Sequence, residues 1–258
     1  MVAAVPSLSP RQRRGMQAAG RAAAETLALA CVAVKPGMTT LEIDQLVARD
    51  TRQRGGRCAT YGYRVPGTPP FPGHLCTSRN EVVCHGIPSA AEVLHEGDIV
   101  NLDVTTELRG WHGDTSRTVA VGTVSAEAAH VMRVAREALE RAIAQVRPGL
   151  PLGIVGEAIE PFVVREGCSV VRGLGGHGIG RRMHQAPHVH HHVVDQPSPI
   201  LRPGMCFTIE PMVCLGSAEV QLLDDGWTVV TVDRRLSAQF EHTICVTEDG
   251  AEVLTRLD

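Results

Sequence analysis

The sequence predicts an α+β fold in which a unit of two helices and a β-hairpin occurs twice. Apolar residues recur at helical spacing in both halves, and strand-like alternation follows them. In addition, four short motifs recur in the same order in both halves, which indicates a duplication. At 258 residues the chain can bury a substantial core. We therefore expect a flexible tail over residues 1–8 and one domain over 9–258, with halves of about 9–122 and 123–258.

Two helices are predicted at the start of the first half. Ser9 and Pro10 are typical of an N-cap and a first helical position, and small and apolar residues then recur at helical spacing. A Lys-Pro-Gly segment ends this helix. Thr39, with Glu42 three residues later, forms a capping-box signature. We expect the second helix to end at about Arg54.

A loop and a strand are predicted between these helices and the hairpin. Residues 58–73 contain too much proline and glycine for regular structure, and loops on rigid scaffolds often carry binding residues. Tyr61, Tyr63 and Phe71 of this loop are candidates for lining a pocket. Residues 75–85 are predicted to form one strand that approaches the site.

The stretch from Asn101 to Asp114 contains the most informative pattern. Its apolar and polar residues alternate, as in a strand with one face in a core, and the run resumes after a break, as in a hairpin. A turn between Leu108 and Arg109 would make Asp103 and Asp114 direct cross-strand partners, with Cβ atoms about 5 Å apart. Such carboxylates repel unless a cation lies between them. As an isolated pair, they would more often be two solvated residues on an exposed face.

The second half repeats this order. Ser125 begins a long predicted helix that ends near Val146, and an Arg-Pro-Gly segment separates it from a shorter helix that ends at 166–167. The interval from Gly97 to Asp103 recurs from Gly204 to Glu210. The corresponding residues of the three motifs that carry possible metal ligands are His85 and His177, Asp103 and Glu210, and Asp114 and Glu241.

A duplication about a pseudo-two-fold axis would bring the two hairpins together. It would converge the carboxylates of Asp103, Asp114, Glu210 and Glu241 with the imidazole of His177. Such a cluster requires cations, and two divalent ions ~3.5–4 Å apart can activate a shared water as hydroxide and polarise the carbonyl that it attacks. The oxygen-rich donor set favours Mn(II), Fe(II) or Co(II) over a closed tetrahedral zinc site, but the sequence leaves the choice among Co, Mn, Fe and Zn open.

Seven ordered motifs make the chain similar to the type I methionine aminopeptidases, metallopeptidases of family M24. The motifs are NEVVCHGIP (80–88), NLDVT (101–105), HGDTS (112–116), GHGIG (176–180), FTIEPMV (207–213), DGWTV (225–229) and SAQFEHT (237–243). The resemblance extends from about Met16 to near the end. It implies the pita-bread fold, in which two related halves hold antiparallel sheet inside and helices outside. It also implies removal of the initiator methionine from new polypeptides, with a small second residue preferred.

The resemblance assigns a role to each predicted ligand. Asp103 corresponds to a bidentate ligand of one metal, and His177 and Glu210 to ligands of the other. Asp114 and Glu241 correspond to bridging ligands. Glu210 would also shuttle the proton of the attacking hydroxide.

Two histidines and a pocket complete the implied site. His85 corresponds to the residue that binds the scissile amide, and His184 to the one that stabilises the developing oxyanion. Either histidine alone would more often be structural. The implied lining of the methionine pocket comprises Phe71, Cys76 and Trp227.

Two departures from the family pattern affect this pocket. Met183 precedes His184 where bacterial relatives usually carry an aromatic residue, and the loop before Cys76 is longer and richer in proline. The second aromatic wall must therefore come from Tyr61 or Tyr63. We expect an intact metal centre with a modified pocket.

Composition limits the location and the partners. The net charge of −3 gives no basic footprint for nucleic acid, and no apolar run approaches the ~18 residues of a membrane span. The eight cysteines contain no C-x-x-C pair, and several lie in apolar runs, as expected in a reducing compartment. We expect a cytoplasmic monomer that acts on the N-terminal segment of nascent polypeptides, with the ribosome as a further candidate partner and no direct nucleic-acid or membrane binding.

Two alternatives and one unassigned motif remain. A proline-specific peptidase of the same fold would normally carry a large amino-terminal domain, and a non-catalytic relative that binds a partner in the old cleft would have lost ligands. The tract from His188 to His192 supplies no carboxylate and belongs to none of the repeated motifs. A polar loop without a designed ion is its more common role.

Overall fold

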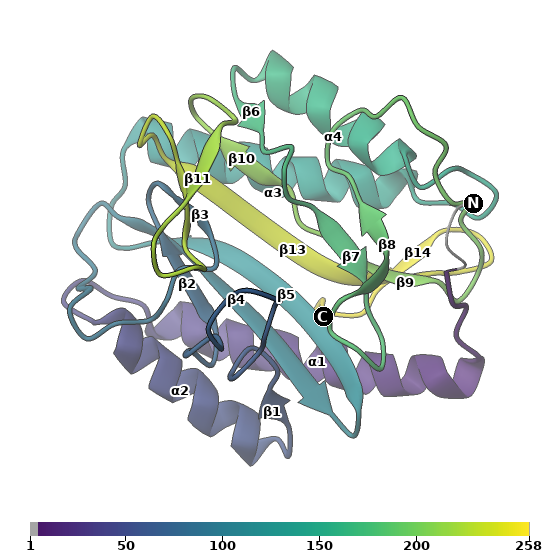
Figure 1. Ribbon diagram of the computed structural model, residues 1–258, viewed down its shortest axis with the longest axis horizontal. Helices are drawn as coiled ribbons and strands as arrows, with labels where there is room; N and C mark the ends of the chain where they lie inside the picture. The colour runs from purple at the N-terminus through teal and green to yellow at the C-terminus, as the bar shows by residue number, and fades with distance from the viewer. Residues whose placement is uncertain (1–4, 258) are drawn as a thin grey trace.

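The computed structural model describes residues 5–257, which form a large antiparallel sheet covered by two helix pairs (Figure 1). The helices of the described chain are α1 (Pro10–Ala33), α2 (Thr40–Gln53), α3 (Ala126–Gln145) and α4 (Ile154–Arg165). The helix pair α1–α2 precedes the β4–β5 hairpin and the pair α3–α4 precedes β9 and β13, so the predicted order recurs in both halves.

The predicted helix starts are confirmed by their caps. Ser9 and Gln12 form a capping box at the start of α1, and Thr39 and Glu42 form another at the start of α2. The side chain of Ser125 accepts a hydrogen bond from the backbone of the first turn of α3. These bonds satisfy N–H groups that have no partner within the helix.

Fourteen strands of the described chain form two sheets. Their bounds are β1 (Arg57–Cys58), β2 (Cys76–Arg79), β3 (Val82–Cys84), β4 (Ile99–Leu108), β5 (Trp111–Ala120), β6 (Ser169–Val170), β7 (Gly176–Gly178), β8 (Gln185–Val189), β9 (Cys206–Ile209), β10 (Met212–Cys214), β11 (Val220–Leu222), β12 (Val229–Thr231), β13 (Ser237–Val246) and β14 (Ala251–Val253). The large sheet has the order β1-β4-β5-β13-β9-β7-β8, with β2, β6, β10 and β14 attached at its sides. The small sheet has the order β11-β12-β3.

Strands β5 and β13 join the two halves at the centre of the large sheet. They pair antiparallel, with Glu241 opposite Ser116. Apolar side chains of β4, such as Leu102, pack against α1 and α2, and those of β9 and β13, such as Ile244, pack against α3 and α4. Figure 1 shows the two helix pairs flanking the long strands. Because alternate strand residues face opposite sides, the polar residues of these strands point to the face without helices.

The predicted register of the β4–β5 hairpin is wrong by two residues. The turn is centred on Arg109 and Gly110, which have φ values of 54° and 75°, so Asp103 pairs with Ser116. Two-residue hairpin turns with positive φ at both positions match the twist of the strands. Asp114 therefore faces Thr105, and the two aspartates are diagonal neighbours on one face.

The single strand predicted over residues 75–85 is also wrong, because the chain turns at Asn80. Asn80 has a φ of 53°, its side-chain amide donates to Asp98, and its side-chain oxygen accepts from the backbone N–H of Ile99. Asparagine tolerates this conformation better than most residues. The turn sends β2 to the large sheet, beside β4, and β3 to the small sheet, beside β12.

Part of the expected flexible tail packs against the domain. Val5 is only 5% exposed, and the backbone N–H of Leu8 donates to the carbonyl of Gly204 at 2.8 Å. Residues 1–4 of that tail lie outside the described residues. Elsewhere, all eight cysteines are free and seven of them are buried, as expected. None of the described helices is long and apolar enough to cross a membrane.

Candidate metal centre

The five predicted ligands converge on the face of the large sheet that carries no helices. They are Asp103 on β4, Asp114 on β5, His177 on β7, Glu210 directly after β9, and Glu241 on β13. These five strands are consecutive neighbours in the sheet, so each ligand lies one strand from the next. Ser116 pairs with both Asp103 and Glu241, which puts these two carboxylates in one row across the strands.

Distances within the cluster fit shared ligation. Nε2 of His177 lies 3.6 Å from Oδ2 of Asp114 and 3.7 Å from Oε1 of Glu210. One ligand atom each of Asp114, His177 and Glu241 lies within 4.8 Å of the other two. These three atoms are therefore close enough together to be candidate ligands of one ion.

Burial of several carboxylates in one place raises their affinity for protons. Burial, followed by the charge of Asp114, raises the pKa of Asp103 and of Glu241 well above the ordinary range. Burial also raises the pKa of Glu210 to about 7, against the opposing effect of His177. For His177, burial lowers the pKa, but the nearby carboxylates of Asp114 and Glu210 outweigh burial and raise the pKa overall. The cluster therefore needs protons or cations to be stable.

The donor set fits divalent metal ions. Oδ1 of Asp103 is buried and has no hydrogen-bond partner in the described part of the chain. A buried carboxylate oxygen without a donor is costly unless a cation or a proton satisfies it. Four carboxylates and one imidazole provide mostly hard oxygen donors, which suit divalent ions of the first transition row.

Neighbouring polar side chains hold the ligands in place, and the sequence analysis did not identify them. Thr208 donates to Oε1 of Glu210 at 2.7 Å and accepts from the backbone of His177 at 2.9 Å. Gln239 donates to Oε2 of Glu210 at 3.1 Å, and Thr105 donates to Oδ1 of Asp114 at 2.7 Å. Each lies two residues from a ligand on the same strand or at its end, so the two-residue period could have revealed them.

His191 is a further residue that the sequence analysis missed. Its side chain is fully buried, and its Nε2 accepts the backbone N–H of Glu210 at 3.1 Å. This bond fixes the backbone where the chain leaves β9. The surrounding run of histidines gave no signal that one of them faces inward.

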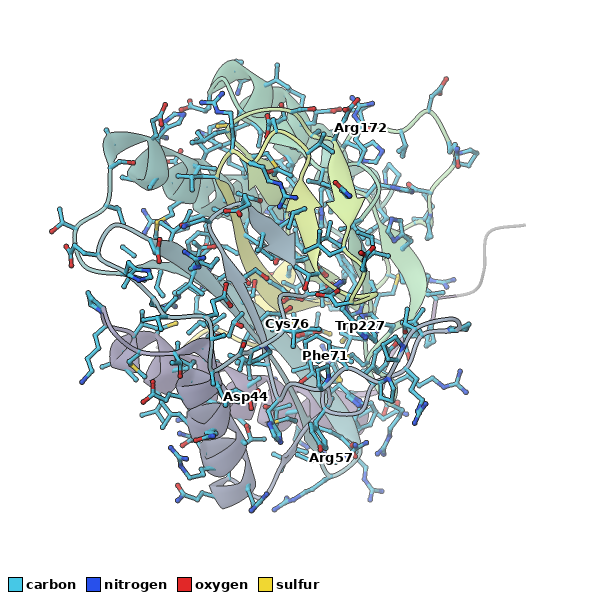
Figure 2. The ribbon with its side chains drawn as sticks, turned by 60° about the vertical axis from the view of Figure 1, so that its left-hand side comes forward. Asp44, Arg57, Phe71, Cys76, Arg172 and Trp227 are labelled. Carbon is cyan, nitrogen blue, oxygen red and sulfur yellow. The ribbon has the colours of Figure 1, made fainter. Side chains whose placement is uncertain are left out.

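A cavity of about 300 Å³ adjoins the ligands and has an apolar wall. Phe71, Cys76 and Trp227 pack together there, as Figure 2 shows, with the rings of Phe71 and Trp227 edge to face at 5.3 Å. Met183 also lines the cavity and is 7% exposed. A larger cavity of about 690 Å³ lies between α1 and α3 on the other face, and its lining also includes Glu241.

The loop of residues 58–73 places Tyr63, not Tyr61, at the site. The hydroxyl of Tyr63 lies 2.6 Å from Nδ1 of His184, and Tyr63 lines the cavity. Tyr61 is 58% exposed and stacks on His74 instead.

Both predicted histidines line the cavity beside the ligands. Burial lowers the pKa of His85, whose ring lies 6.4 Å from that of Trp227. His184 lies at the rim, with its ring 4.1 Å from that of His177, and partial burial followed by the effect of His177 lowers its pKa to about 4. Both rings are therefore neutral near pH 7, so each can donate one hydrogen bond and accept another.

The fold and the ligand cluster together define a metallopeptidase of the pita-bread type. Residues 14–248 match the profile of Metallopeptidase family M24. Methionine aminopeptidase B of Synechocystis is 48% identical over 248 residues, which cover 96% of this chain and 90% of the relative. Methionine aminopeptidase of Escherichia coli is 45% identical over 254 residues, which cover 98% and 94%. The chain belongs to metallopeptidase family M24 and, within it, to the methionine aminopeptidases.

Solved structures agree with this placement. The crystal structure of methionine aminopeptidase from Rickettsia prowazekii superposes with a TM-score of 0.94 at 42% identity, covering 98% of this chain and 100% of that one. The prolidase from Pyrococcus furiosus, at 18% identity and a TM-score of 0.77, shares the fold alone, and 66% of that chain is covered. The predicted α+β pita-bread fold is confirmed.

Proposed function

We propose that the chain is a metal-dependent aminopeptidase that removes the N-terminal methionine of polypeptides. The observation that carries the proposal is the convergence of five ligands, Asp103, Asp114, His177, Glu210 and Glu241, directly beside an apolar cavity of about 300 Å³. An N-terminal side chain in the cavity would bring its peptide bond to the ligand cluster.

The cavity suits an unbranched, polarisable side chain. Phe71 and Trp227 offer aromatic surface, and Cys76 closes the wall between them and β4. Thioether sulfur makes favourable contacts with aromatic rings. Trp227 is fixed by donating from Nε1 to the carbonyl of Pro69 at 2.9 Å, so the wall is preorganised.

The five ligands would hold two divalent ions: Asp103 would bind one, His177 and Glu210 would bind the other, and Asp114 and Glu241 would contribute to both. When bound, such ions lower the pKa of a water molecule and polarise a carbonyl. Glu210 would carry the proton of the attacking water to the leaving amine. Its carboxylate is held by Thr208 and Gln239, and its backbone by His191, which keeps the proton carrier in place.

His85 and His184 would act on the scissile bond. Tyr63 can donate its hydroxyl proton to Nδ1 of His184, which leaves Nε2 of that ring as a donor. A neutral donor aimed at the cavity can stabilise negative charge that develops on a carbonyl oxygen. We assign the scissile amide to His85, which lines the same cavity.

The substrates that we propose are nascent polypeptides with a small second residue, cleaved by a monomer in the cytoplasm. The eight free cysteines, seven of them buried, support a reducing compartment.

Peptide specificity tests this function. Metal-loaded protein incubated with Met-Gly-Met-Met should release methionine, and it should leave Xaa-Pro dipeptides intact. Cleavage of Xaa-Pro alone would favour a proline-specific peptidase. No turnover of either substrate by metal-saturated protein would favour a non-catalytic binding protein.

A further inference from the structure

The run of histidines after the cleft divides into two faces. Strand β8 ends at Val189, and the alternation of less and more buried side chains continues from His188 through the bend at residues 191–192. Val189 and His191 are fully buried on one side. His188, His190 and His192 lie on the other, and none of these three has a role in the catalytic site as described above. We call these three residues the histidine row.

Adjacent rings of the histidine row lie at a separation that suits a shared ion. The ring centroids of His188 and His190 are 4.5 Å apart, and those of His190 and His192 are 5.2 Å apart. Two imidazoles on one zinc ion place their ring centroids about 5 Å apart, because each Zn–N bond is ~2.0–2.1 Å long and the geometry is tetrahedral. Both spacings are close to that value.

Ring nitrogens of the row are available as ligands. Nδ1 of His190 and Nδ1 of His192 are buried and have no hydrogen-bond partner among residues 5–257. Burial, followed by the neighbouring His190, lowers the pKa of His188 and of His192, so both rings are neutral near pH 7. A neutral imidazole with a free lone pair is the form that binds metal.

Two charged residues beside the row pair with each other. Arg172, labelled in Figure 2, pairs with Glu160 at 2.6 Å. Glu160 also accepts the backbone N–H of Val193 at 2.9 Å, which anchors the end of the row. The carboxylate of Glu160 is therefore paired with a cation, and the donors that the row itself supplies are imidazoles.

We propose that His190, together with His188 or His192, binds one borderline divalent ion at a second site outside the catalytic centre. An all-imidazole donor set suits Zn²⁺, Ni²⁺ or Cu²⁺, whereas the catalytic set is rich in oxygen. The site opens to a cavity of about 220 Å³ lined by His188 and His190. His188 also lines the substrate cleft, so the ion would lie at its rim. This proposal does not depend on the catalytic activity.

Copper titration of a full-length variant that lacks two of the five catalytic ligands tests the site. In Asp103→Asn/Asp114→Asn protein, calorimetry with Cu²⁺ should detect one ion per chain, with nitrogen hyperfine coupling from two imidazoles in the electron paramagnetic resonance spectrum. Adding His190→Gln should weaken this binding at least 10-fold. The matched control His95→Gln, at a lone histidine whose side chain is 72% exposed, should leave the affinity unchanged.

Two further measurements keep the test decisive. If the double variant does not fold, the stoichiometry of Zn²⁺ on the otherwise native chain should fall by one ion when His190→Gln is introduced. His188→Gln and His192→Gln identify the second ligand, since only one of them should match the effect of His190→Gln. Equal Cu²⁺ affinity with and without His190→Gln, in protein whose circular dichroism is unchanged, would overturn the proposal.

Discussion

Asp103 and Asp114 lie diagonally across the β4–β5 hairpin, since Asp103 pairs with Ser116 and Asp114 with Thr105. Diagonal neighbours on one face are separated by about 7–8 Å at Cα, farther than direct partners. This spacing leaves room for a cation between the carboxylates. Glu241 belongs to the other half of the chain and lies in the same row as Asp103, because both residues pair with Ser116. The metal centre therefore depends on the register of the hairpin and on the pairing of the two halves.

Removal of one ligand should impair metal binding more than stability. Asp103→Asn removes a buried charge that repels Asp114, so the metal-free protein should melt at an unchanged or higher temperature. Metal affinity and kcat/KM for methionyl peptides should each fall by more than about 100-fold, since even residues behind the ligands contribute 10–100-fold. Calorimetry and peptide assays measure both, and the exposed Asp195→Asn is the control. Near-native activity in Asp103→Asn protein would show that Asp103 is not an essential metal ligand.

Metal affinity should increase with pH between about 4.5 and about 7. The pKa of Glu210 rises from 4.5 to about 7 in the metal-free fold, so folding favours its protonated form. Its contribution to metal-free stability is present below pH 4.5 and is lost as the pH rises toward 7. Metal ions must displace these protons. Calorimetry in buffers of different ionisation enthalpy should detect proton release at pH 6, and metal affinity that is constant from pH 5 to 7 would contradict this account.

The hydrogen bond between Tyr63 and His184 should increase the rate of the chemical step. Tyr63→Phe removes the hydroxyl that lies 2.6 Å from Nδ1 of His184 and frees the ring to adopt the other tautomer. A loss of about 1–1.5 kcal/mol corresponds to a fall in kcat of roughly 5- to 10-fold. Tyr61→Phe, at an exposed ring outside the cavity, is the matched control. The same kcat in both variants would exclude Tyr63 from a positioning role.

The close approach of α1 to β5 should make Gly113 intolerant of substitution. A Cβ at Gly113 would lie 2.5 Å from the backbone of Gly20, whereas a Cβ at Gly173 would contact nothing within 4 Å. Overpacking of this kind costs about 1–3 kcal/mol. Gly113→Ala should lower Tm by roughly 2–10 °C, and Gly173→Ala should change it little. Equal melting temperatures in differential scanning calorimetry would show that α1 can move away from β5.

Local rules in the sequence predicted most of the elements. The capping boxes at Ser9 and Thr39 and the cap at Ser125 fixed three helix starts, because a side chain there satisfies backbone groups a few residues away. The two-residue alternation placed Asp103 and Glu210 on polar strand faces. Whether the two halves meet depends on long-range pairing, which the ordered repeats and the resemblance to the family predicted and local rules could not.

The sequence did not predict features in which one residue has an uncommon backbone conformation. It also did not predict which of several similar side chains points into the fold or the site. Arg109 and Asn80 both have positive φ, which their side chains do not require, so the hairpin register and the turn between β2 and β3 were missed. His191 differs from its neighbours only in facing inward. The choice of Tyr63 over Tyr61 depended on the path of an irregular loop, which no periodic pattern describes.

Anomalous diffraction from crystals loaded with Mn²⁺ would locate the bound ions and their ligands. The five ligands should surround two anomalous peaks about 3.5–4 Å apart, with Asp114 and Glu241 each contacting both. Asp103 should contact one ion, and His177 with Glu210 the other. Peaks elsewhere in the fold, or Asp114 and Glu241 that share no ion at full occupancy, would contradict the account.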